Sequence, residues 1–196
     1  MSGIDNIFEG IFLIAFFIGM VIRAVNGFRN RKSKSERKYK SVIEIVLLNA
    51  AGVTMILPFL FIFTSLLSFA DYNLPQWVGW IGTALMVMSL ILLWRSHADL
   101  GHNWSATIQV KQEHTLVTNG VYRYVRHPMY LAMMSWAAAQ GLLLGNWLAG
   151  WGFLACFIPI YLIRAPKEER IMLEQFGEQY SQYVKCTGRI IPRFWK

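Results

Sequence analysis

The sequence predicts an all-α integral membrane protein with five transmembrane helices and a cytoplasmic C-terminal region. Of its 196 residues, 55% are hydrophobic and only 15% are charged, whereas about 25% of the residues of a soluble domain carry charge. The charges are also absent from four long runs of the chain. Because a bilayer crossing needs about 20 consecutive apolar residues, several such runs indicate membrane spans rather than the buried helices of a soluble protein.

Three spans are expected in the N-terminal region, residues 1–94. The first covers residues 7–25, where the charged residues lie near the two ends. The second and third fall in the uncharged runs 45–70 and 72–94. Pro58 is expected to kink the second span, since proline lacks the N–H that the interior of a helix requires.

The other two spans are predicted to form a hairpin, residues 128–163, within the C-terminal region 95–196. The run from His127 to Ile163 holds 37 residues without a formal charge, which is too long for one crossing and fits two short ones. Gly145 and Asn146 divide this run, and a Gly-Asn pair is typical of a turn.

An amphipathic helix is predicted after the hairpin, in the sequence that begins RAPKEERIMLEQFGEQYSQY. Its apolar side chains recur at near-helical spacing at Ile171, Phe176, Tyr180 and Tyr183, which is typical of a helix that lies on a protein or membrane surface. Before the hairpin, residues 95–126 mix β-branched residues with Gly and Asn. This mixture predicts a loop with a short strand.

The distribution of charge predicts how the spans are oriented. All 19 Lys and Arg residues lie in three segments, which five crossings put on one side of the membrane. The positive-inside rule makes that side cytoplasmic, so the N-terminus is expected outside and the C-terminus in the cytoplasm. The start of the chain, MSGID, lacks the positive region of a cleaved signal peptide, so we expect the first span to be retained. The three segments are Arg23–Lys40 with eight of these residues, Arg95–Arg126 with four, and Arg164–Lys196 with seven.

The basic loop 23–40 contains the run RNRKSKSERKYK. In a short loop between two spans, such a run contacts lipid headgroups, so we expect membrane lipids and no nucleic acid as partners. The sequence indicates no particular oligomeric state.

The triplet Arg126-His127-Pro128 stands at the start of the hairpin. A proline in the first turn of a helix has its φ preset and costs no hydrogen bond. The start of that helix would present free N–H groups and the positive end of the helix dipole to an anion. The alternative is that Arg126 and His127 only mark the level of the headgroups.

Arg164 and Glu168 are the second candidate pair, at the other end of the hairpin. The topology returns Arg164 to the level of His127, and Glu168, four residues later, can share its helix face. Pro166 is expected to bend the helix so that both side chains face one cavity. An ionisable pair at a membrane boundary is a candidate site, and a simple interfacial ion pair is the alternative.

No metal site is predicted. The candidate ligands do not form a Cys/His cluster or a His-Glu-x-x-His motif. They are His97, Asp99, His102 and His114.

Four segments of the C-terminal region resemble the isoprenylcysteine carboxyl methyltransferase family: HNWSATIQV, HTLVTNGVYRYVRHPMY, RAPKEE, and FGEQYSQY followed by GRIIP. The family pattern is Arg-His-Pro-x-Tyr, then a hairpin, then an Arg and paired Glu residues. The resemblance covers residues 95–196, and the five-span length and early basic loop are similar to the small prokaryotic members. Phospholipid N-methyltransferases and the C-terminal part of sterol reductases are similar in the same region.

The resemblance implies that S-adenosylmethionine binds in a pocket that faces the cytoplasm and leaves as S-adenosylhomocysteine. A lipid-like acceptor would enter from the bilayer. Arg164 aligns with the substrate arginine of the family, and Arg164 and Glu168 are the implied catalytic residues. The residues implied to bind the cofactor are Gln109, His114, Thr115, Leu116, Val117, Tyr122, His127, Pro128, Met129, Tyr130 and Glu168.

Methylation of a prenylcysteine-like carboxylate is therefore the expected activity, because such a carboxylate is already ionised at neutral pH and Arg164 can hold it. A phospholipid or amine N-methyltransferase of the same fold is the first alternative. It would need a base near the methyl group and has less use for Arg164. A transporter or non-catalytic membrane scaffold, which would have no affinity for the cofactor, is the second alternative.

Overall fold

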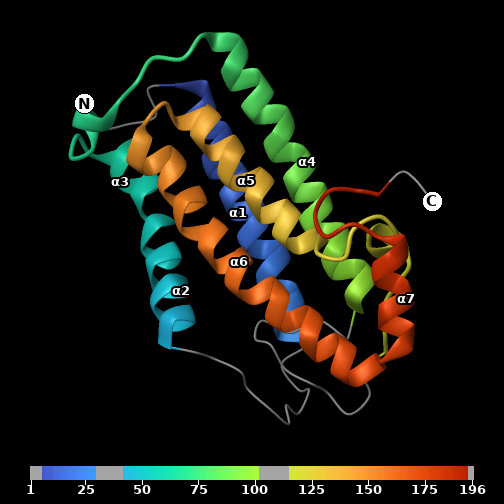
Figure 1. Ribbon diagram of the computed structural model, residues 1–196. Helices are drawn as coiled ribbons and strands as arrows, with labels where there is room; N and C mark the ends of the chain where they lie inside the picture. Colours follow the sequence, from blue (N-terminus) through green and yellow to red (C-terminus); the bar gives the residue numbers. More distant parts are fainter. Residues whose placement is uncertain (1–5, 30–41, 102–114, 194–196) are drawn as a thin grey trace.

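The computed structural model describes residues 6–29, 42–101 and 115–193, and the described chain is a bundle of helices (Figure 1). Within these ranges it forms no strand, only two isolated bridges, Asp71 with Asn146 and Val125 with Gly188. The predicted all-α fold is confirmed. The elements are α1 (Ile7–Arg29), α2 (Val42–Thr54), α3 (Leu57–Phe63), the 3-10 helix η1 (Ser68–Ala70), α4 (Gln76–Leu100), the 3-10 helix η3 (Gly120–Arg123), α5 (Pro128–Leu144), α6 (Trp147–Phe176) and α7 (Glu178–Cys186).

Four helical segments are long and apolar enough to cross a membrane: α1, α2 with α3, α4 and α6. Each of these segments exposes large apolar side chains, for example Trp77, Trp80, Met88 and Ile91 on α4. Such faces suit lipid contact rather than water. The chain is therefore a multi-pass membrane protein. The remaining predicted span, the first of the hairpin, is α5, which has 17 residues, and its crossing stays a prediction.

The core lies between α1, α4, α5 and α6. Figure 1 shows α5 beside both α4 and α6, with α2 and α3 along the other side of α6. Large apolar side chains from four helices meet there and are almost fully buried: Phe12, Met86, Trp136 and Phe153. This arrangement brings the start of α5 and the second half of α6 to the same end of the bundle.

The predicted turn is confirmed, and the second span is interrupted near Pro58, whereas the bend at Pro166 stays a prediction. Gly145 ends α5 in the left-handed region with φ +57°, and the buried Asn146 caps α6 by accepting from the N–H groups of Leu148 and Ala149 at 3.0 and 2.9 Å. At Pro58 the effect is a break rather than a bend, because α2 ends at Thr54 and α3 begins with this proline in its first turn.

One predicted boundary is wrong, and one helix is longer than the charge-free run that predicted it. The helix of the third predicted span, α4, continues beyond Trp94 to Leu100. The amphipathic helix after the hairpin is not one separate helix, because α6 runs unbroken through both Pro159 and Pro166 to Phe176. Gly177, with φ +51°, then starts the separate helix α7. Residues 115–126 of the predicted loop contain η3, and residues 102–114 of that loop lie outside the described residues, so the short strand stays a prediction.

Helices α5 and α6 approach each other closely at Gly141 and Gly150. A Cβ atom at Gly150 would lie 2.9 Å from the Cα atom of Gly141, so this backbone contact has no room for a methyl group. We expect Gly150→Ala to lower the free energy of unfolding by about 1–3 kcal/mol through overpacking.

Thermal unfolding in detergent measures this effect, and Gly152→Ala is the matched control. At Gly152 the nearest atoms to a new Cβ are 3.6 Å away, an ordinary contact, and alanine favours the helix. Equal melting temperatures for the two variants would contradict the close crossing.

Candidate active site

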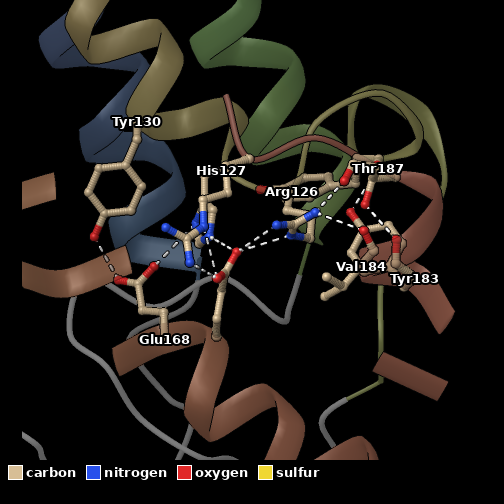
Figure 2. A network of polar contacts seen from close by, with 10 residues as sticks. Arg126, His127, Tyr130, Glu168, Tyr183, Val184 and Thr187 are labelled. Atoms are coloured by element: carbon tan, nitrogen blue, oxygen red, sulfur yellow. Dashed lines mark hydrogen bonds and ion pairs between the residues drawn. The ribbon is translucent and has the colours of Figure 1, made fainter. Parts of the chain in front are cut away.

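The candidate site lies where the start of α5 meets the second half of α6 and the segment after α7 (Figure 2). The length of α6 makes this possible, because its 30 residues extend past the 17-residue α5. Two adjacent carboxylates, Glu168 and Glu169, are surrounded by arginines from three segments: Arg126 just before α5, Arg164 on α6 and Arg189 after α7.

Glu168 is held by three residues. The hydroxyl of Tyr130 donates to Oε1 at 2.7 Å, and Nη2 of Arg164 lies 3.6 Å from the same oxygen. Nδ1 of His127 lies 3.7 Å from Oε2. The predicted pairing of Arg164 with Glu168 is therefore present, and the first turn of α5 contributes to it.

Arg164 has a hydrogen-bond donor that no described residue uses. Its side chain is 14% exposed, and among the described residues its buried Nε atom has no hydrogen-bond partner. A buried donor without a partner is costly. The structure thus leaves part of the guanidinium available to an anionic ligand.

Glu169 contacts residues just before α5 and after α7, and it does not pair with Arg164. Its Oε1 accepts from Nε of Arg126 at 3.0 Å and lies 3.3 Å from Nε2 of His127. Its Oε2 accepts from Nε and Nη2 of Arg189 at 3.0 and 2.6 Å. The hydrogen bonds that Arg189 donates to Glu169 raise the pKa of Arg189 above its ordinary value.

The segment that follows α7 lies against the start of α5. The backbone N–H groups of Arg126 and His127 donate to the carbonyls of Gly188 and Arg189 at 2.8 and 2.9 Å. The guanidinium of Arg126 also donates to the carbonyls of Val184, at 3.3 Å, and Thr187. Arg126 is therefore a structural residue here and not only a marker of the headgroup level.

The 3-10 helix η3 is fixed to the same end of the bundle. Oδ2 of Asp99, on the last turns of α4, accepts from the N–H of Val121 at 2.8 Å. The hydroxyl of Tyr122 donates to the carbonyl of Ser96 at 3.3 Å, and the hydroxyl of Tyr183 donates to the carbonyl of Tyr122 at 2.6 Å. Burial raises the pKa of Tyr183 to about 12 and also raises the pKa of Tyr122, so both hydroxyls keep their protons at neutral pH.

The sequence-predicted residues divide into three groups. The described structure brings Tyr122, His127, Pro128, Tyr130, Arg164 and Glu168 to one end of the bundle. Met129 is half-buried in the first turn of α5, and residues 115–117 form the irregular chain that leads to η3. Gln109 and His114 lie outside the described residues.

Sequence reasoning missed Glu169 and Arg189. The signal was present, because Glu169 is the second of the paired glutamates and Arg189 lies in GRIIP. The described residues contain no group of three or more His, Cys, Asp or Glu side chains that could hold a metal ion.

Comparison with known proteins identifies similar sequences and a similar fold. Residues 80–174 match the model of the isoprenylcysteine carboxyl methyltransferase (ICMT) family. The chain is 27% identical over 143 residues to protein-S-isoprenylcysteine O-methyltransferase A of Arabidopsis thaliana, covering 72% of this chain and 73% of the relative. It is 35% identical over 94 residues to the protein-S-isoprenylcysteine O-methyltransferase of Schizosaccharomyces pombe, covering 47% of this chain and 40% of the relative.

A solved structure of the eukaryotic intramembrane Ras methyltransferase ICMT is similar with a TM-score of 0.55 and 24% identity. The match covers 79% of this chain and 53% of that chain, so this protein spans about half the length of the solved relative. At this identity the likeness concerns the fold.

Proposed function

We propose that this chain is a member of the isoprenylcysteine carboxyl methyltransferase family, whose model residues 80–174 match, and that it methylates the C-terminal carboxylate of a prenylcysteine-like lipophilic substrate at the membrane. The methyl donor is S-adenosylmethionine, and S-adenosylhomocysteine is the second product. The observation that carries the proposal is Arg164, whose buried Nε has no hydrogen-bond partner among the described residues. A planar guanidinium with free donors suits a carboxylate, which it can bind with two parallel hydrogen bonds.

The proposed reaction requires alignment rather than proton removal. The pKa of a C-terminal carboxylate is ordinarily near 3.5, so the group is ionised at neutral pH and needs no general base. Arg164 would hold the acceptor carboxylate, while Glu168, 3.6 Å away, keeps the guanidinium oriented. The apolar helices around this end of the bundle would exclude water from the reaction.

The residues around Glu168 fit the polar part of the cofactor. When bound, S-adenosylmethionine supplies an electrophilic methyl group on a sulfonium. Glu168 can accept hydrogen bonds from an amino or ribose group, and Figure 2 shows the polar atoms of His127 and Tyr130 directed toward its carboxylate. By family resemblance, Tyr122, Pro128, Met129 and residues 109 and 114–117 would complete this pocket.

A methyl-transfer assay tests the proposal. Purified protein is incubated with labelled S-adenosylmethionine and a panel of prenylcysteines, phospholipids and small amines. We expect label in the prenylcysteines, in a product that is cleaved by base like a methyl ester. Label only in phospholipids or amines would favour the N-methyltransferase alternative, and absence of both transfer and cofactor binding would favour the transporter or scaffold.

The same proposal places the site on the cytoplasmic side, with the N-terminus outside. It is supported by the one-sided distribution of Lys and Arg. We expect Asn73→Cys, in a variant without Cys156 and Cys186, to react with a membrane-impermeant thiol reagent only from outside. The exposed native Cys186, kept as the single cysteine, should react only from the cytoplasmic side, and the reverse pattern would overturn the orientation.

A further inference from the structure

Glu44 is a buried carboxylate that the proposed mechanism does not use. It lies in the first turn of α2, within the membrane-length segment Val42–Phe63, and its side chain is only 3% exposed. Lys167 on α6 donates to it and forms an ion pair. A buried charge at a membrane boundary is costly unless it is paired, so this pair is expected to have a role.

The pair borders the candidate site. Lys167 directly precedes Glu168 on α6, which packs along α2. The carboxylate of Glu44 is close enough for its charge to act on both Tyr130 and Glu168. Three carboxylates therefore share this end of the bundle: Glu44, Glu168 and Glu169.

Each of these carboxylates has its own cation in the structure. Glu44 pairs with Lys167, Glu168 pairs with Arg164, and Glu169 pairs with Arg126 and Arg189. This pairing of carboxylates with cations depends on every partner, because a lysine is a point charge on a long flexible stem that can move to another acceptor. If Glu44 lost its charge, the ammonium of Lys167 would be left unpaired near Glu168. If Lys167 lost its charge, Glu44 would compete for Arg164.

We propose that Glu44 is a positioning residue: it holds Lys167 away from Glu168 and thereby leaves Glu168 to Tyr130 and Arg164. The effect on turnover rests on the proposed function, whereas the rearrangement of the ion pairs does not. The proposal predicts that neutralising either partner is harmful, and that neutralising both partners is much less harmful.

The first measurement is kcat/KM for a prenylcysteine acceptor at saturating S-adenosylmethionine. We expect Lys167→Met, which leaves the buried Glu44 without its partner, and Glu44→Gln, which frees Lys167 to approach Glu168, each to lower it by about tenfold or more. The double variant should return to within about threefold of the parent, because it leaves neither an unpaired buried carboxylate nor a cation free to approach Glu168. Glu174→Gln and Lys185→Met, at exposed positions on α6 and α7, are the matched controls and should match the parent.

The second measurement needs no activity. Melting temperatures are compared for Lys167→Met, Glu168→Gln and their combination, in the parent and in the Glu44→Gln variant. In the parent the two shifts should add. In the Glu44→Gln variant they should deviate from additivity by about 2–4 °C, because Lys167 then interacts with Glu168.

The outcomes separate the two proposals. Additive shifts in both backgrounds, or a double variant as impaired as Glu44→Gln alone, would overturn the positioning role. A parent that methylates no acceptor in the panel would overturn the proposed function, and the melting temperatures would still decide whether Glu44 keeps Lys167 away from Glu168.

Discussion

Replacing Arg164 with alanine is expected to reduce methyl transfer to a prenylcysteine by roughly 30-fold to several-thousand-fold, the equivalent of losing about 2–5 kcal/mol of a buried charge-assisted contact. The reason is that its guanidinium is mostly buried, pairs with Glu168 at 3.6 Å, and keeps at Nε a donor without a described partner. The measurement is turnover with a prenylcysteine acceptor. Binding of S-adenosylmethionine, measured by calorimetry, should fall far less.

Two variants, Arg164→Lys and Arg170→Ala, provide the controls for this prediction. Arg164→Lys should recover little activity, because a point charge cannot reproduce two parallel hydrogen bonds. Arg170→Ala, at an exposed position on the same helix, should remain as active as the parent. Full activity in Arg164→Lys would contradict the carboxylate role and favour an amine acceptor.

The elements that the sequence predicts well are those that depend on neighbouring residues. The hairpin turn at Gly145 and Asn146 follows from local turn chemistry, and the interruption at Pro58 follows from the missing N–H of proline. The charge-free runs indicate a membrane protein because the length of a crossing is fixed by the bilayer. These features need no knowledge of tertiary contacts.

The error in the helix boundary has a local cause of its own. The charged sequence after Ile163 suggests the end of a span, but α6 continues through it to Phe176. Charge ends the apolar character of a helix without ending its backbone hydrogen bonds, and the pairing of Arg164 with Glu168 four residues later supports the continuation. The actual end is at Gly177, where the positive φ favours glycine.

The candidate site is predicted only in part, because half of it depends on contacts between distant segments. Arg164 and Glu168 share one helix face, so spacing alone pairs them. Glu169, in contrast, obtains its partners from residues 42–43 positions earlier, Arg126 and His127, and from Arg189, 20 positions later. No periodicity in the sequence reveals such a meeting point, which is why Glu169 was missed.

The importance of Glu169 leads to the second large expected effect, on stability. Glu169→Ala should lower the free energy of unfolding by about 3–5 kcal/mol, the usual result of leaving a buried ion-pair partner uncompensated. The side chains of Arg126 and Glu169 are only 8% and 13% exposed, so water cannot replace the lost carboxylate. The measurement is thermal unfolding in detergent, together with the rate at which a protease cleaves the segment after α7.

Two control variants show whether the loss of stability comes from the buried ion pair between Glu169 and Arg126. Arg189→Ala should cost at most about 1 kcal/mol, because that arginine is 48% exposed and its pairing is screened by solvent. Glu174→Ala removes an exposed carboxylate five residues further along α6 and should leave both the melting temperature and the cleavage rate unchanged. If Glu169→Ala and Arg189→Ala were equally mild, Arg126 would be satisfied by the carbonyls of Val184 and Thr187 alone. In that case those backbone contacts, and not the carboxylate of Glu169, would hold the segment after α7 against the start of α5.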